Sequence, residues 1–145
     1  MARFAAGWRT GAGSTTLPIA SLYAPANNQL VIYEIGVFNT TATAVAVAVQ
    51  RLSTTGTQGA GQTEIGIDDT IATAVGTAFT THSVAPTITA GFIRAATLGA
   101  AVGSGVIFTF SERGLRIPQG TTNGIGITIP TGTGQIVDCY WEWSE

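Results

Sequence analysis

"NTTATAVAVAVQRL", residues 39–52, alternates valine with alanine over six consecutive positions. Side chains point to opposite faces of a strand with period two, so this pattern predicts a β-strand with one bulky and one nearly flat face. The bulky face would fill a core, whereas the flat face is apolar and needs a cover of its own. The two faces consist of Val45, Val47 and Val49 and of Ala44, Ala46 and Ala48.

The rest of the chain has the rhythm of an all-β domain, because Gly, Thr and Asn interrupt apolar runs of about five to ten residues. In the last run, Val137, Cys139, Trp141 and Trp143 alternate with more polar residues. The absence of a βαβ rhythm favours an antiparallel β-sandwich, and we expect a jelly roll. We expect one domain over residues 1–145. The clearest strand candidates are residues 30–38, 44–52, 105–110, 124–130 and 135–143.

Three local expectations concern the connections. The short link 39–41 predicts an antiparallel hairpin between the runs on either side of it. Residues 93–103, rich in Ala, predict a loop or one short helix. Residues 1–24 mix Arg, Trp and Phe with a Gly/Ser/Thr-rich stretch, which predicts an N-terminal arm or a first strand.

Charge is scarce in this sequence. Only 10% of the residues are charged, against about 25% in a typical soluble domain, and the net charge is −2. We therefore expect no direct binding of nucleic acid, although six scattered arginines could still meet in space. No apolar run is long enough to cross a membrane as a helix. The single cysteine and the lack of a signal-like start favour synthesis in the cytoplasm.

A search for catalytic and metal-binding residues finds no complete set. The only histidine, His82, has no motif around it, and we expect it on the surface of a strand. Cys139 is expected to fill the core. Glu64, Asp68 and Asp69 lack a calcium-loop spacing, and one Cys with one His cannot supply a zinc site. We predict no enzyme, no metal and no cofactor.

The alanine face has two possible covers. An arm or loop of the same chain could lie over it, or a neighbouring subunit could do so. The sequence pattern is the same in both cases, so it does not distinguish a cover from the same chain from one supplied by a neighbouring subunit.

Four stretches of the chain carry a resemblance: "GAGSTTLPIASLYA", "YEIGVFNTTATAVAVAVQRLSTTGTQGAG", "LRIPQGTTNGIGITIP" and the terminal "YWEW". In this order they resemble small β-sandwich virion structural proteins of tailed bacteriophages, of the capsid decoration or cement type. The resemblance implies a jelly-roll module on the exterior of the virion, made in the host cytoplasm. It also implies the major capsid protein and further copies of itself as partners, in a homo-oligomer such as a trimer.

Arginine and tryptophan are frequent in interface hot spots. We expect partner contacts from the arm and from the flat face: Arg3, Phe4, Trp8, Arg9, Ala44, Ala46 and Ala48.

Two other functions stay open. A carbohydrate-binding or host-surface-binding module, of the fibre-head or lectin-like kind, could stack sugars on Trp8, Trp141 or Trp143. A small hydrolytic or metal-dependent enzyme would need a site around His82 or the acids 64–69.

Overall fold

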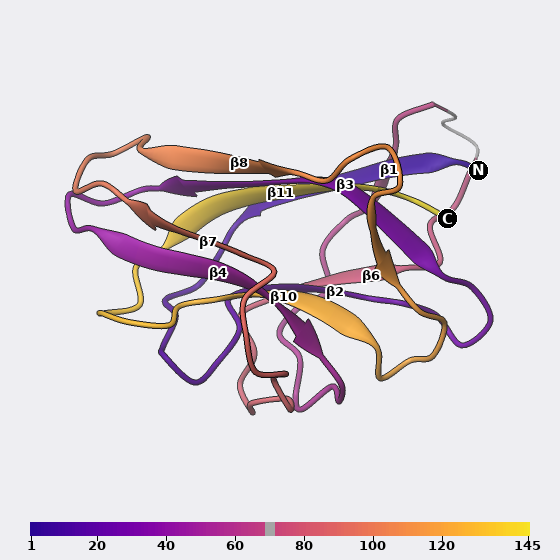
Figure 1. Ribbon diagram of the computed structural model, residues 1–145, viewed down its shortest axis with the longest axis horizontal. Helices are drawn as coiled ribbons and strands as arrows, with labels where there is room; N and C mark the ends of the chain where they lie inside the picture. Colours follow the sequence, from indigo (N-terminus) through magenta and orange to yellow (C-terminus); the bar gives the residue numbers. More distant parts are fainter. Residues whose placement is uncertain (69–71) are drawn as a thin grey trace.

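The computed structural model describes residues 1–68 and 72–145. Within these residues the protein is all-β and contains no helix. Two antiparallel sheets pack face to face, and Figure 1 shows them as an upper and a lower layer. The antiparallel β-sandwich predicted from the sequence is confirmed.

The upper layer, sheet A, has six strands, and the lower layer, sheet B, has five. Sheet A contains, in spatial order, β5 (Ile65–Gly66), β1 (Arg3–Arg9), β11 (Val137–Ser144), β3 (Leu30–Asn39) and β8 (Gly105–Thr109), with β9 (Leu115–Ile117) paired to the start of β3. Sheet B contains β6 (Thr77–Thr80), β2 (Ala20–Tyr23), β10 (Gly124–Thr128), β4 (Val45–Leu52) and β7 (Arg94–Leu98).

The connectivity is that of a jelly roll. The chain pairs as one long antiparallel ribbon, in which β1 pairs with β11, β2 with β10, β3 with β8, and β4 with β7. The ribbon is rolled so that these four pairs fall alternately in sheet A and sheet B. The short strands β5 and β6, which lie between β4 and β7 in the sequence, extend both sheets on the same side of the sandwich.

The core lies between the sheets and uses the alternating faces predicted from the sequence. Val45, Val47 and Val49 of β4 are almost completely buried. The indole rings of Trp141 and Trp143, which project from β11, have no exposed surface at all. Burying one valine side chain of β4 in this way stabilises the fold by about 1.5–3 kcal/mol.

The predicted hairpin at residues 39–41 is wrong. β3 belongs to sheet A and β4 to sheet B, so the link crosses from one layer to the other instead of joining neighbours. Asn39 holds this corner: its side-chain Nδ2 donates to the carbonyl oxygens of Thr43 (2.7 Å) and Gly99 (2.9 Å). The buried amide thus ties together two connections that leave the sandwich at this end.

The predicted loop or short helix at residues 93–103 is wrong for residues 94–98, which form β7, whereas residues 99–103 do form a loop. β7 pairs with β4 along its length, opposing Ala96 to Val47 and Leu98 to Val45. The local preference of alanine for helix is overridden because β4 would otherwise be left as an unpaired edge.

The N-terminus forms a first strand and not an arm. β1 lies between β5 and β11, and Phe4 opposes Trp143 in the register, with ring centroids 6.0 Å apart. Deleting the residues before Thr15 would therefore remove an inner strand of sheet A.

Candidate interaction surfaces

His82 is buried, contrary to the expectation of a surface position. It follows β6, its side chain is 1% exposed, and its Nε2 lies 2.8 Å from the hydroxyl oxygen of Ser21. Ser21 is completely buried as well. Burial lowers the pKa of His82, while the nearby backbone of Thr55 and Val84 acts in the opposite direction. The pair joins the connection after β6 to strand β2 and is closed to a substrate in this conformation.

The other residues considered for catalysis or metal binding are Cys139 and the acidic residues 64–69, and the structure does not bring those that it describes together into one site. Cys139 is buried among core residues, and burial raises the pKa of its thiol to about 12. The Glu64 carboxylate accepts a hydrogen bond from the backbone N–H of Ala78 (3.0 Å), whereas Asp68 is exposed. Asp69 lies outside the described residues. Among the residues that are described, no group of three or more His, Cys, Asp or Glu side chains is arranged to hold a metal ion.

Half of the alanine face is covered by the protein's own chain. The covering segment, residues 81–93, crosses the outer side of sheet B and forms a β-bridge between Ile88 and Leu52. The side-chain Nε2 of Gln50 donates to two carbonyl oxygens of this segment, those of Thr89 and Gly91, each at 3.3 Å. Ala48 is consequently buried.

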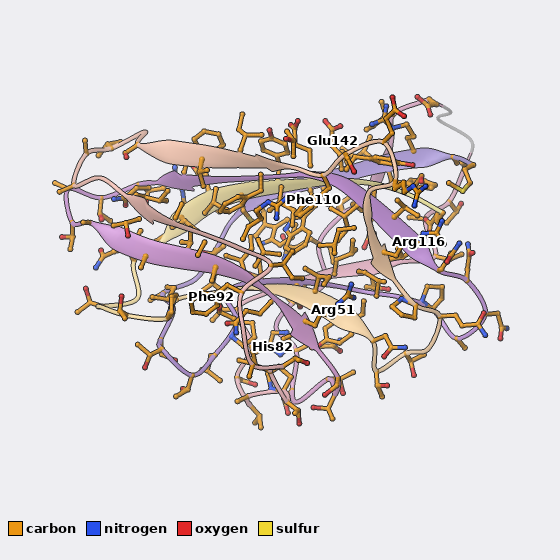
Figure 2. All side chains as sticks on the ribbon, in the orientation of Figure 1. Arg51, His82, Phe92, Phe110, Arg116 and Glu142 are labelled. Carbon is orange, nitrogen blue, oxygen red and sulfur yellow. The ribbon has the colours of Figure 1, made fainter. Side chains whose placement is uncertain are left out.

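The other half of the face is open. Ala46 is half-buried and Ala44 is exposed. Beside them, a shallow depression of about 490 Å³ is lined by small uncharged residues and by Phe92, which is 55% exposed and lies below sheet B in Figure 2. The lining residues are Ala46, Val47, Phe92, Ala95, Ala96, Thr97, Pro130 and Thr131. This open half, hereafter the Phe92 surface, contains no charged side chain in its lining.

The outer face of sheet A is different, because it carries aromatic and charged side chains. The ring of Tyr140 lies across Gly36 on the adjacent strand and stacks with Phe38 at a centroid distance of 6.3 Å. The Arg9 guanidinium forms an ion pair with Asp138 at 2.7 Å, which lowers the pKa of that carboxyl. Most polar groups on this face therefore already have partners within the domain.

The residues expected to contact a partner lie in three different parts of the structure. Arg3 and Arg9 lie on the outer face of sheet A, where they pair with Glu142 and Asp138. Phe4 is buried in the core, and Trp8 packs partly buried against it. These side chains therefore do not form one contact surface, and only the open alanines adjoin the Phe92 surface.

The aromatic residues proposed for sugar stacking are mostly unavailable. Trp141 and Trp143 have no exposed surface, and Trp8 faces the core. Phe92 was missed by the sequence reasoning. The sequence feature that could have indicated its exposure is its position: Phe92 is an aromatic residue in a Gly- and Thr-rich stretch that has no alternating pattern.

Comparisons with known proteins add no relative: no family model, no curated protein and no solved structure matches the chain. In residues 1–68 and 72–145, no helix has the length and apolar character needed to cross a bilayer.

Proposed function

We propose that this protein is a non-enzymatic virion structural protein of the capsid decoration type. It binds assembled major capsid subunits on the outside of the shell and stabilises them. The observation that carries the binding role is the Phe92 surface, an open and uncharged depression on sheet B. The assignment to a virion rests on the resemblance of the sequence to small phage β-sandwich proteins.

The composition of the Phe92 surface suits protein contact. Charged residues are depleted in the cores of protein interfaces, where a few large side chains seated in pockets supply most of the binding free energy. Phe92 would be such an anchor, because more than half of its surface is exposed while its neighbours are small. Small neighbours allow a partner to approach the backbone closely.

The surface is also held rigidly, which lowers the entropic cost of binding. Ala95 and Thr97 belong to β7, which is paired with β4 throughout. Phe92 follows the part of the covering segment that Gln50 ties to sheet B, and the backbone N–H of the next residue, Ile93, donates to the carbonyl oxygen of Val49 at 2.8 Å.

Stabilisation of a shell follows from preferential binding. A protein that binds only the assembled arrangement adds its binding free energy to that state by mass action. Contacts with more than one capsid subunit increase this effect through a high effective concentration.

The test is co-sedimentation with assembled shells and with free capsid subunits of the source virus. We expect the wild-type protein to sediment with shells and not with free subunits. Thr97→Lys places a charge in the Phe92 surface and should abolish sedimentation. Thr109→Lys is the matched control, because it makes the same change at an exposed position of β8 in sheet A, where Thr109 pairs with Glu34 of β3. Equal binding by the two variants, or no binding of wild type to shells, would overturn the proposal.

A carbohydrate-binding function is the second candidate, and a different site now favours it. A depression of about 480 Å³ lies beside the edge-to-face pair Tyr23 and Phe79 and includes uncharged polar side chains such as Gln58 and Thr121. Aromatic faces with hydroxyl and amide groups are suited to sugar rings. Selective binding on a glycan array that is lost in Phe79→Ala would support this function over the capsid one.

A further inference from the structure

Apart from the ion pairs Arg3–Glu142 and Arg9–Asp138 on the outer face of sheet A, most charged residues lie on two opposite sides of the sandwich. One side is formed by β7 of sheet B with β8 and β9 of sheet A, and the other by β5 of sheet A and β6 of sheet B. Four of the six basic residues belong to the first side, which we call the basic edge: Arg51, Arg94, Arg113 and Arg116. Among the described residues, Glu112 in the turn before β9 accompanies them, and Glu34 of the adjacent strand β3 pairs with Thr109 of β8.

The basic edge is built across the gap between the two layers. Arg51 extends from β4, and its Nη1 donates to the carbonyl oxygen of Arg116 on β9 at 2.9 Å (Figure 2). The guanidinium of Arg94 lies over the ring of Phe110, 5.5 Å from its centroid. Among the described residues, none of the four arginines forms an ion pair, whereas Arg3 and Arg9 each have a carboxylate partner.

The opposite side, the acidic edge, carries Glu64, Asp68 and Glu145. The carboxylate of Glu145 accepts hydrogen bonds from the backbone N–H groups of Val75 (2.9 Å) and Gly76 (2.8 Å). These neutral donors fix the carboxylate and leave its negative charge uncompensated. The edge also carries exposed apolar side chains, and Ile65 of β5 is 64% exposed.

We propose that the basic edge of one copy binds the acidic edge of a second copy. The argument is charge complementarity: the surface that matches the unpaired arginines in sign is present on the same chain, and an exposed apolar side chain accompanies each edge, Ile107 of β8 on the basic edge and Ile65 on the acidic edge. Because the two edges lie on opposite sides of one domain, the contact is head to tail and generates a ring if it closes or a chain if it does not. This association does not depend on the Phe92 surface or on the proposed function.

The test uses two variants, each with one damaged edge. Arg113→Glu with Arg116→Glu reverses charges on the basic edge at side chains that have no hydrogen bond within the described structure. Asp68→Arg with Thr63→Arg changes the acidic edge at two exposed positions. We expect wild type to form species larger than the 14.8 kDa monomer in sedimentation velocity at low salt. These should shrink toward the monomer at 1 M salt, where the Debye length falls to about 3 Å.

Mixing the variants distinguishes head-to-tail binding from other modes. Each variant alone should be monomeric, whereas an equimolar mixture should assemble into dimers or larger species, because it reunites one intact basic edge with one intact acidic edge and because the two reversed edges are also opposite in charge. A control with Arg9→Asp and Asp138→Arg swaps two charges on the outer face of sheet A and should assemble as wild type does. A wild-type monomer at all concentrations, variants that still assemble, or a mixture that stays monomeric would overturn the inference. Circular dichroism of each variant verifies that the sandwich is intact.

Discussion

The Nε2 atom of His82 lies 2.8 Å from the hydroxyl oxygen of Ser21, and both side chains are buried where the covering segment meets sheet B. The only histidine of the chain thus fastens the segment that closes half of the alanine face. A hydrogen bond at this place couples the cover to the core of the jelly roll.

The first prediction concerns pH. Burial lowers the pKa of His82 in the folded protein, so the unfolded state binds more protons below its ordinary value of about 6.5. The contribution of His82 to stability is therefore complete above that pH and is lost as pH falls below it, by at most about 1.4 kcal/mol per pH unit. Thermal unfolding between pH 7.5 and 5 should show this decrease.

His82→Gln removes the titrating group and should flatten the pH dependence between pH 7.5 and 5. The ion pair of Asp138 with Arg9 does not interfere, because a lowered carboxyl pKa affects stability only below about pH 4. An NMR titration that gave His82 a pKa above 6.5 would contradict the prediction, whether or not the variant folds.

The second prediction concerns the close approach of Tyr140 to Gly36. A Cβ atom added at position 36 would collide with the ring of Tyr140. Gly36→Ala should therefore displace this ring and lower the free energy of unfolding by about 0.5–1.5 kcal/mol, the cost of a side chain forced off its preferred rotamer, as measured by urea denaturation.

Gly7→Ala is the matched control, because an added Cβ there lies 3.4 Å from Cβ of the same Tyr140, an ordinary contact. In the Tyr140→Ala background, Gly36→Ala should cost less than in wild type. Equal losses at positions 7 and 36 would show that the ring does not require glycine beneath it.

The third prediction concerns the corner between the layers. Asn39→Leu leaves the carbonyl oxygens of Thr43 and Gly99 without their side-chain donor. Both hydrogen bonds are part-buried and each contributes about 0.5–1.5 kcal/mol, so the midpoint of urea unfolding should fall clearly. Asn123→Ala removes a single exposed hydrogen bond to Gln119 and should have a smaller effect. A larger loss at position 123 would contradict this account of the corner.

The fourth prediction concerns the reactivity of Cys139. Its thiol is buried and its pKa is raised to about 12, so almost no thiolate is present at neutral pH. Labelling by iodoacetamide should be slow in the native protein and should accelerate in parallel with unfolding as urea is added. Rapid labelling without denaturant would mean that β11 opens locally.

Much of the fold could be read from the alternation of side chains. The valine face of β4, the alternate aromatic and aliphatic positions of β11 and the strand at residues 124–128 all face the core as expected, because period two fixes which side chains share a face. The candidate surface was harder to foresee. Ala44, Ala46 and Ala48 alternate identically in sequence, but only Ala48 lies where the covering segment passes.

The errors share one physical cause. A link such as residues 39–41 is compatible with a hairpin or with a crossing between sheets, and residues 93–103 prefer a helix only while they are considered alone. The choice depends on which edges and faces the rest of the chain leaves uncovered. His82 was placed on the surface for the same reason, because its hydrogen-bond partner Ser21 is 61 residues away.

The sequence by itself determined an all-β domain, the residues that fill its core and its shortage of charge, because these depend on composition and on contacts between near neighbours. Only the tertiary structure decided which strands pair, which half of the alanine face stays open and that four scattered arginines belong to one edge. Those properties depend on how the ribbon is rolled, which brings together residues that no local pattern connects.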